Sequence, residues 1–323
     1  MAWDWPQPAV LALAVLLALA LDRAWGEPPA WLHPVVGMGR WLAFLGDRVA
    51  PRAGQPQRPG PRRLLGALAW LLGALSVCAG AYLVQTALSS WHGWAQAVAL
   101  GVLLKPMLAW RMLRDEVAAV EGALAQSLDA GRAQVARLVS RDVYALDEAG
   151  VRQAALSTLA ENLNDSVVAP LCWFAVAGLP GAVLYRWSNT ADAMWGYRGV
   201  RAGRDWTWAG WWAARADDAL SWWPARLTAL LLFAAAGRRP DEGLAAQARR
   251  TPSPNGGWPM GALALALDVR LDKPGVYTLH ATGRTPGPAD TAAALRMCGR
   301  VVAGCALLAA GVAWCGGWAA WRP

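Results

Sequence analysis

Two pairs of amide and carboxylate side chains share the spacing Asn-x-x-Asp. The first pair is Asn162 and Asp165, and the second is Asn189 and Asp192. On a helix, Glu161 lies on the same face as the first pair, one turn before Asp165. Carboxylate and amide oxygens at this spacing suit Mg²⁺, which takes few protein ligands and completes its shell with nucleotide phosphates. The spacing therefore predicts a metal–nucleotide site.

The same residues also fit a structural role. Helical spacing adds Ser157 and Thr158 to the polar face of Glu161, Asn162 and Asp165, and a solvated face of this kind can cap a membrane helix. The second pair also suits a turn in which an Asx side chain caps the backbone. Spacing alone therefore leaves both the metal site and the capping role open.

Adjacent carboxylates precede a third candidate group. Asp217 and Asp218 are followed by Pro224-Ala-Arg226-Leu-Thr, and the apolar run after Arg226 is too short to cross a membrane alone. An arginine at membrane depth is costly, and it pairs with a carboxylate or binds an anion. The sequence therefore predicts either an anion site at Arg226 or an Asp–Arg pair that locks two helices.

A loop rich in glycine and proline, Thr251-Pro-Ser-Pro-Asn-Gly-Gly-Trp-Pro-Met260, contributes Ser253, Asn255 and Trp258. Backbone amides of such a loop can cradle phosphate, although its composition is equally that of a connector. His33 lies beside the first apolar run, and a lone histidine is more often structural than catalytic.

The composition is that of a membrane protein. Of 323 residues, 56% are hydrophobic and only 16% are charged, and the mean hydropathy is +0.26, which is too apolar for an ordinary soluble domain. The net charge of +8 fits an anionic membrane surface, and no basic run interleaved with aromatic residues supports nucleic-acid binding. The five cysteines form no C-x-x-C motif, which favours small buried side chains over disulfides or metal ligands.

Apolar segments long enough for membrane-spanning helices occur at about 6–21, 64–88, 94–110 and 300–321. The positive-inside rule places the arginine-rich polar segments in the cytoplasm; these are residues 22–63, 111–165, 186–219 and 238–297. We therefore expect an all-α, polytopic integral membrane protein, with residues 1–323 forming a single membrane-embedded domain. It would have four full transmembrane helices, re-entrant or short membrane helices, and cytoplasmic amphipathic helices.

A fifth apolar stretch, residues 166–185, is broken in its middle by Gly178, Pro180 and Gly181. As one helix its length would be about 30 Å, whereas each half reaches only about 20 Å. Arginines in the segment that follows favour a return to the cytoplasmic side. We therefore prefer a re-entrant helical hairpin to a full span, and we expect it to bring the two Asn-x-x-Asp pairs to the same face, where they could meet in one site.

Taken together, the motifs resemble one family, the adenosylcobinamide-phosphate synthases of cobalamin biosynthesis, in the family's order from about residue 20 to 300. The motifs are Asp22-Arg-Ala-Trp-Gly-Glu-Pro-Pro with His33-Pro34, Ser140-Arg-Asp142, Ala160-Glu-Asn-x-x-Asp165, Asn189-Thr-x-Asp192-x-Met-x-Gly196, Asp217-Asp218 with Pro224-Ala-Arg226-Leu-Thr, and Ser253-Pro-Asn-x-Gly-Trp-Pro-Met260. The departures are small. Glu27 stands where the family often has Asp, Ser166 where Gly is common, and Ser221 where Asn is usual, which leaves the amine specificity open.

The resemblance implies an amide ligase that joins adenosylcobyric acid, a corrinoid, to aminopropanol or its phosphate, driven by ATP with Mg²⁺ through an acyl phosphate. It implies a multi-pass protein of the bacterial inner membrane whose active site faces the cytoplasm. Expected partners are membrane lipids, a second copy of the chain and other cobalamin-assembly enzymes, but not nucleic acid.

The resemblance also implies roles for individual residues. Asp165, Asp192 and Asp217 would be catalytic, and the metal would be held by Glu161, Asp165 and Asp192. Substrate-binding roles would fall to Asn162, Asn189, Arg198, Asp218, Arg226, Ser253, Asn255, Trp258 and His33.

Two rival functions fit the same scaffold. A non-catalytic membrane sensor or assembly protein is the alternative, because a fold does not fix a function. The retained Asp165, Asp192, Asp217 and Asn255 argue against it. A transporter is the third reading, because broken helices beside polar groups also form transport sites.

Overall fold

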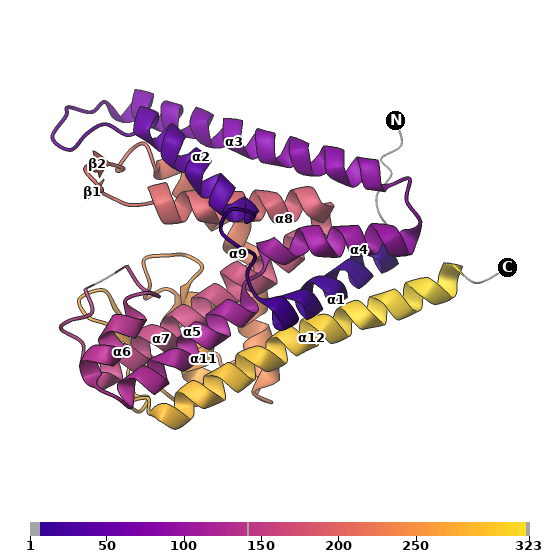
Figure 1. Ribbon diagram of the computed structural model, residues 1–323. Helices are drawn as coiled ribbons and strands as arrows, with labels where there is room; N and C mark the ends of the chain where they lie inside the picture. Colours follow the sequence, from indigo (N-terminus) through magenta and orange to yellow (C-terminus); the bar gives the residue numbers. More distant parts are fainter. Residues whose placement is uncertain (1–6, 141, 321–323) are drawn as a thin grey trace. The chain divides into compact units, whose positions relative to one another are not determined.

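The structure, a computed structural model, describes residues 7–140 and 142–320 (Figure 1). The expected outer ends of the first and last spans, residues 6 and 321, lie outside the described residues, as does position 141 of the Ser140-Arg-Asp142 motif. The chain forms two compact units. Unit 1 contains Met1–Leu108, Ala169–Leu220 and Leu308–Pro323, and unit 2 contains Ala109–Val168 and Ser221–Leu307. That the whole chain acts as one membrane-embedded domain stays a prediction.

Unit 1 is a bundle of helices in which α1 packs on α4, and α8 packs on both α2 and α3. Proline opens three of these helices, at Pro8, Pro34 and Pro59, where its missing N–H costs nothing and its fixed φ favours the first turn. The helices are α1 (Pro8–Trp25), α2 (Pro34–Val49), α3 (Pro59–Leu88), α4 (Gly93–Leu104) with the 3₁₀ turn η1 (Lys105–Met107), and α8 (Ala169–Trp195). A hairpin of β1 (Val200–Arg201) and β2 (Arg204–Asp205) follows α8.

Unit 2 packs shorter amphipathic helices around α7, which contacts α5, α6, α11 and β3. Its elements are α5 (Trp110–Leu124), α6 (Leu128–Val135), α7 (Glu148–Leu163), the π-helical turn η2 (Asn164–Val168), α10 (Leu244–Ala248), α11 (Gly257–Leu267), and the antiparallel pair β3 (Leu271–Lys273) and β4 (Tyr277–Leu279). Helix α9 (Trp211–Ala235) leads from unit 1 into unit 2, and α12 (Pro288–Ala320) leads back.

The expected amphipathic helix after residue 110 is confirmed, because Leu113, Val117, Val120 and Leu124 form the buried face of α5. Helix α7 differs from the expectation of a solvated polar face. Ser157 and Thr158 are buried together with its leucines, since α7 has neighbours on several sides. On this predicted polar face, only Glu161, Asn162 and Asp165 remain partly exposed to solvent.

The prediction of an all-α, multi-pass membrane protein is confirmed. Within the described ranges 7–140 and 142–320, five helical segments are long and apolar enough to cross a membrane: Pro8–Trp25, Pro59–Leu88, Gly93–Leu124, Glu148–Trp195 and Pro288–Cys315. On α3, seven leucine side chains are more than 40% exposed (64, 65, 68, 71, 72, 75 and 83), which is the surface of a helix that faces lipid. In the third segment the helix is interrupted at η1, where Lys105 and Pro106 follow α4.

The fourth segment, Glu148–Trp195, is not one straight helix. Its backbone leaves the helical region at Ala177 and Gly178, which is the break that the sequence predicts. A Cβ placed on Gly181 would lie 2.2 Å from the carbonyl oxygen of Trp173, although residues eight positions apart are about 12 Å apart along a straight helix. The chain therefore bends sharply at Gly178, which divides α8 into two arms. That the two arms form a re-entrant hairpin in the membrane stays a prediction.

Gln85 on α3 stabilises this bend through a hydrogen bond. Its side-chain Oε1 accepts a hydrogen bond of 2.8 Å from the backbone N–H of Leu179, the first residue after the break. The Gln85 side chain is buried near the C-terminal end of α3. In a membrane the N–H that a broken helix frees needs a protein partner, because no water is present to bind it.

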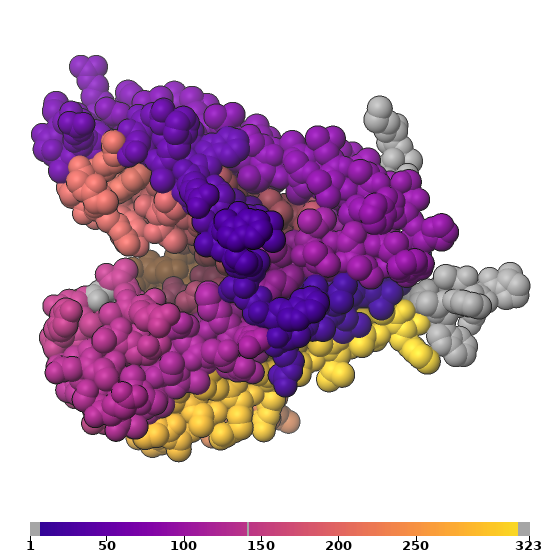
Figure 2. All heavy atoms as spheres, viewed as in Figure 1, coloured from indigo at the N-terminus to yellow at the C-terminus, as the bar shows by residue number. Residues whose placement is uncertain are grey.

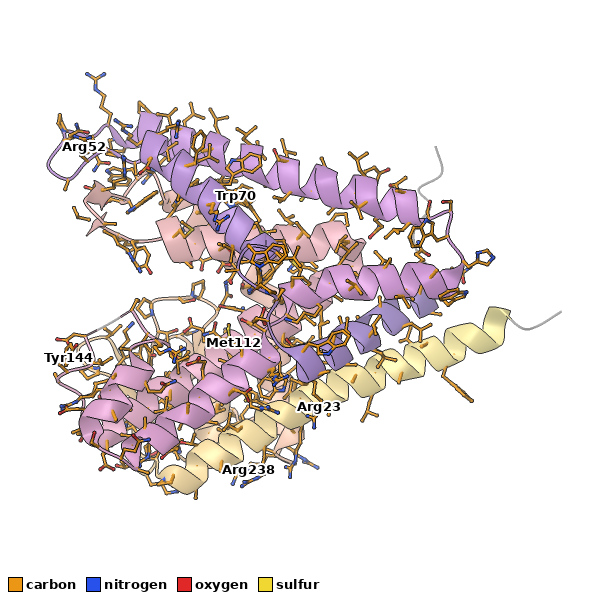
Figure 3. All side chains as sticks on the ribbon, viewed as in Figure 1. Arg23, Arg52, Trp70, Met112, Tyr144 and Arg238 are labelled. Atoms are coloured by element: carbon orange, nitrogen blue, oxygen red, sulfur yellow. The ribbon has the colours of Figure 1, made fainter. Side chains whose placement is uncertain are left out.

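The α2 side chains lie at the surface of unit 1 that Figure 2 shows. The ring centroid of Trp41 on α2 lies 6.5 Å from that of Trp187 on α8. Trp187, fully buried on the second arm of α8, donates its indole N–H to the carbonyl of Trp70 at 3.2 Å. Trp70 is labelled on α3 in Figure 3, and its hydrogen bond with Trp187 links α3 to the second arm of α8.

We predict that Gly178→Ala destabilises the protein strongly. Gly178 has φ of +57° and ψ of −152°, a region that costs other residues about 1–3 kcal/mol, and an added Cβ would lie 2.3 Å from Gln85 Oε1. The midpoint of thermal unfolding in detergent measures the effect. Gly80→Ala on α3 is the matched control, because nothing lies within 4 Å of its Cβ position, and its midpoint should be unchanged or higher. Equal midpoints for the two variants would contradict the role of Gly178 in the bend.

Candidate functional site

Unit 2 holds Asp165 in a network of buried polar groups. Asp165 lies in the π-helical turn η2, and turns of this kind occur frequently at functional sites. The side chain of Asn164 donates to Asp165 Oδ1 at 2.8 Å, and the Thr228 hydroxyl of α9 donates to Asn164 Oδ1 at 3.1 Å. Because Asn164 and Thr228 are buried, they fix the direction of a carboxylate that remains partly exposed.

Glu161, one turn before Asp165 on the same helix, lies against the predicted ligand loop. A Cβ on Gly256 would be 2.8 Å from Glu161 Oε1, so glycine is needed for this close approach. Asn162 donates to the carbonyl of Thr158 at 3.1 Å, which ties its amide back to the helix. Among residues 7–140 and 142–320 there is no group of three or more His, Cys, Asp or Glu side chains that could hold a metal ion. Two partly exposed carboxylates one turn apart nevertheless fit Mg²⁺, which binds one or two protein carboxylates and takes its other ligands from phosphates and water.

Residues 251–256 form the loop before α11. The predicted loop is therefore shorter than the sequence suggests, because Gly257 to Met260 already belong to the first turn of α11. Ser253 Oγ accepts hydrogen bonds from the backbone N–H groups of Asn255 (3.2 Å) and Gly256 (3.1 Å). Arg226 of α9 donates to Asn255 Oδ1 at 3.0 Å and to the carbonyl of Pro254 at 3.4 Å. Two of the predicted ligand-binding elements, Arg226 and the loop, therefore meet in unit 2.

Arg226 also contacts two indole rings. Its guanidinium carbon lies 4.3 Å from the ring centroid of Trp222 and 4.6 Å from that of Trp258, distances at which cation–π attraction is significant. Burial lowers the pKa of Arg226 from its usual value. A tryptophan in this segment is expected to offer its flat ring to a flat ligand such as a corrin or adenine ring. Arg226 already covers one side of the Trp258 ring.

Unit 1 assembles the second group of predicted residues where the end of α8 meets the first half of α9. The amide of Asn189 lies 3.5 Å from Asp217 Oδ1. Asp192, one turn after Asn189, turns its carboxylate over the end of its own helix, where a Cβ on Gly196 would lie 1.9 Å from Asp192 Oδ1. The glycine in the Asn189–Gly196 motif is therefore required by the position of the carboxylate.

Asp218 belongs to the same group and pairs with Arg215 at 3.2 Å. Burial raises the pKa of Asp218 above the usual aspartate value, and the positive charges of Arg215 and Arg198 offset only part of this rise. Arg198, exposed in the turn after α8, thus acts on Asp218 through its charge. No such electrostatic link is evident from the sequence, because Arg198 and Asp218 are twenty positions apart.

His33 lies in a separate charged network of unit 1. Its Nδ1 accepts the backbone N–H of Val35 at 3.2 Å and caps α2, while Nε2 lies 2.8 Å from Glu27 Oε2. Lys105 Nζ is 3.1 Å from Glu27 and 3.5 Å from Asp22. Burial alone would raise the pKa of Glu27, but the hydrogen bond with His33 and the charge of Lys105 lower it. Both His33 ring nitrogens are therefore engaged within the protein.

Sequence reasoning did not single out three of these residues: Gln85, Lys105 and Asn164. The signal for the first two was available, because each is a lone polar side chain beside a long uncharged stretch, and such residues are seldom without a role. Asn164 lies between the two motif positions of Asn162-x-x-Asp165. The two Asn-x-x-Asp pairs belong to different units, so their meeting in one site stays a prediction.

A model of the family described as CobD/Cbib protein matches residues 15–301. The chain belongs to this family. The matched residues include both Asn-x-x-Asp pairs, Arg226, residues 251–258 and the His33 network.

Named relatives extend over most of the chain. It is 38% identical over 315 residues to the cobalamin biosynthesis protein CobD of Rhodobacter capsulatus, which covers 92% of this chain and 96% of the relative. It is 40% identical over 305 residues to a probable cobalamin biosynthesis protein CobD of Thermococcus kodakarensis, covering 93% and 97% of the two chains. A third probable CobD, from Methanothermobacter thermautotrophicus, is 38% identical over 271 residues, with 82% and 85% covered. No solved structure matches the chain significantly.

We predict that Arg226→Lys loosens the loop while keeping the positive charge. Lysine cannot reproduce the paired hydrogen bonds or the planar stacking of a guanidinium. Backbone amides of residues 255–258 should exchange hydrogen for deuterium faster, by about tenfold for a loss near 1.4 kcal/mol. Arg239→Lys, an exposed change nearby in the sequence, should leave their exchange unaltered. Unchanged exchange in both variants would contradict the role of Arg226.

We predict that Asp218→Asn raises the thermal stability at pH 7. A folded-state pKa above the usual value means that the ionised carboxylate disfavours folding, so stability falls as the pH rises through that pKa. Asparagine carries no charge and therefore removes this unfavourable contribution to the free energy of folding. The difference in unfolding midpoint between variant and wild type should therefore shrink below about pH 4, near the usual aspartate pKa. A lower midpoint for the variant at pH 7 would mean that the pairs with Arg215 and Arg198 outweigh the burial.

Proposed function

We propose that this CobD/Cbib family protein is an ATP-dependent amide ligase of cobalamin biosynthesis. It would join the free carboxylate of adenosylcobyric acid to aminopropanol or its phosphate, giving adenosylcobinamide or its phosphate. The observation that carries the proposal is the family match over residues 15–301, combined with partly exposed Asp165, Asp192 and Asp217 at the family's motif positions.

The chemistry requires activation, because a carboxylate and an amine do not condense unaided in water. In the first step the substrate carboxylate oxygen attacks the γ-phosphorus of ATP, the bond to the β-phosphate oxygen breaks, and ADP leaves. In the second step the neutral amine attacks the acyl phosphate carbon, phosphate leaves with the electron pair of the C–O bond, and the amine nitrogen loses a proton. Positioning and charge neutralisation are the two demands on the protein.

The residues of unit 2 supply groups for the nucleotide half of this reaction. Glu161 and Asp165 would hold Mg²⁺, which neutralises phosphate charge when bound. Arg226 would place its positive charge and its remaining N–H donors beside the loop. Asn255, fixed by Arg226 and by the Ser253 hydroxyl, would orient the ligand.

The residues of unit 1 suit the amine half. Asp192, with Asn189 and Asp217 beside it, presents carboxylates to a positively charged amino-alcohol, and a carboxylate near the amine can also accept its proton. Asp218, whose pKa is raised, is tuned in the direction that a proton acceptor requires. Asp192 as a metal ligand, which the family resemblance implies, remains a second possible role for this carboxylate.

We further propose that the protein resides in the bacterial inner membrane with residues 22–63, 111–165, 186–219 and 238–297 in the cytoplasm, where ATP is found. Their arginine content supports this orientation. Other cobalamin-assembly enzymes and a second copy of the chain are the expected protein partners.

We predict that purified protein in detergent forms the amide from adenosylcobyric acid, aminopropanol phosphate, ATP and Mg²⁺, as detected by mass spectrometry. Asp165→Asn and Asp192→Asn should each lower turnover by about 100-fold or more, because each removes a charge that acts on the transition state. Asp115→Asn is the matched control, since Asp115 is a half-exposed surface carboxylate on α5. If the wild type forms no amide in the complete mixture with ATP, the proposed ligase activity is refuted. Near-normal turnover of one variant would assign that residue to a structural role.

A further inference from the structure

A pocket of about 300 Å³ lies within unit 1, apart from the residues assigned to the ligase. Its walls come from the last turns of α2, the end of α8, the β1–β2 hairpin and Trp206. In Figure 1 the hairpin lies beyond the end of α8, and Figure 3 labels Arg52 in the neighbouring loop between α2 and α3. A cavity of this size holds a small organic molecule with few polar groups.

The hairpin that carries the pocket's arginines is held by its backbone. Arg201 pairs with Arg204 across the two strands, and the intervening Ala202 and Gly203 both have positive φ, as a two-residue type I′ turn requires. The loop after α2 adds hydrogen bonds from Ala53 N–H to the Gly203 carbonyl (2.9 Å) and from Asp205 N–H to the Pro51 carbonyl (3.0 Å). Both arginine side chains therefore start from a fixed backbone at the pocket wall.

The pocket offers hydrogen-bond donors and little acceptor capacity. Arg204 is 2.9 Å from Asp47 and donates to the Ala50 carbonyl at 2.7 Å, so Asp47, the one carboxylate in the wall, is already neutralised. Arg201 stacks on Tyr197 at 3.7 Å, and no hydrogen bond or ion pair involves its guanidinium within residues 7–140 and 142–320. One positive charge is left over.

Trp195 provides the decisive observation. Its side chain is buried, 1% exposed, and stacks on Trp206 with 5.8 Å between ring centroids. In the part of the chain that the structure describes, its indole N–H has no hydrogen-bond partner. A buried donor without a protein partner is costly and calls for an explanation, of which a bound ligand is one. By contrast, the buried indole of Trp187 is satisfied by a carbonyl.

Two helix ends oppose an anion here, because α2 and α8 both end at the pocket and carry partial negative charge. The carbonyls at the end of α2 are capped, however, by Arg62 on Val49 (3.1 Å) and by Arg204 on Ala50. The full charge of Arg201 outweighs the partial charge that remains.

We propose that this pocket binds an oxyanion, namely the phosphate group of a small phosphomonoester or of a membrane lipid. Arg201 supplies the charge, the Trp195 indole N–H and Arg204 supply further donors, and the apolar wall of Ala43, Ala193 and Met194 accommodates a short carbon chain. The inference is independent of the proposed ligase activity.

The test measures binding to the full chain, purified in a phosphate-free, non-phospholipid detergent, by isothermal titration calorimetry and by ligand-induced shift of the unfolding midpoint. One arm uses inorganic phosphate, a second uses glycerol phosphate, and a third uses short-chain phosphatidic acid, all at constant ionic strength set with chloride. Binding in either of the first two arms identifies a free phosphate compound as the ligand, and binding in the third arm alone identifies a lipid phosphate.

Arg201→Gln, an exposed change, should weaken binding by about tenfold or more, while Arg40→Gln, an exposed arginine of α2, should bind like the wild type. Trp195→Phe removes the donor and should diminish the ligand-induced midpoint shift relative to its own ligand-free midpoint. If Trp195→Phe fails to fold, Arg201→Gln alone decides. Absence of binding in all three arms, or equal binding by wild type and Arg201→Gln, would overturn the proposal.

Discussion

The sharp bend of the chain at Gly178 is the constraint on which unit 1 depends. A broken helix inside a membrane must satisfy the backbone groups that its bend releases, because no water is available to do so. Gln85 meets this need by accepting the N–H of Leu179, and Gly178 leaves the space that the Gln85 amide occupies. The second arm of α8 can then pack on α2 and α3. The end of this arm places Asn189 beside Asp217 in the first half of α9.

Unit 1 holds four charged or titratable side chains in one small, largely buried group. Lys105 lies between Asp22 and Glu27, and Glu27 also contacts His33. Removing one partner from such a buried set leaves an uncompensated charge and costs about 3–5 kcal/mol. The network therefore fixes the end of α1, the start of α2 and the turn after α4 relative to one another.

The candidate site residues differ in how firmly they are held. Asp165 is oriented by two buried side chains, and Asn255 is held by Arg226 and Ser253. This arrangement resembles a preorganised site, in which supporting hydrogen bonds fix the functional groups before the ligand arrives. Trp258 illustrates the opposite outcome: a side chain expected to stack on a ligand already has a partner on one face. Membership of the CobD/Cbib family gives these positions a shared context, and the ligase activity is the function that their chemistry supports best.

The sequence alone determined the all-α membrane class, the apolar segments, the buried face of α5 and the break at Gly178, because apolar length, helical periodicity and glycine or proline positions are local properties. It also identified the polar motif residues, since their types and order are visible in the chain. Only the tertiary structure decided what each side chain contacts. Ser157 and Thr158 are buried because other helices surround α7. Gln85 binds a backbone N–H because α3 lies beside α8. The pKa of Asp218 is raised because the effect of burial outweighs the charges of Arg198 and Arg215. Burial and partners depend on residues far apart in the sequence, and no local pattern encodes them.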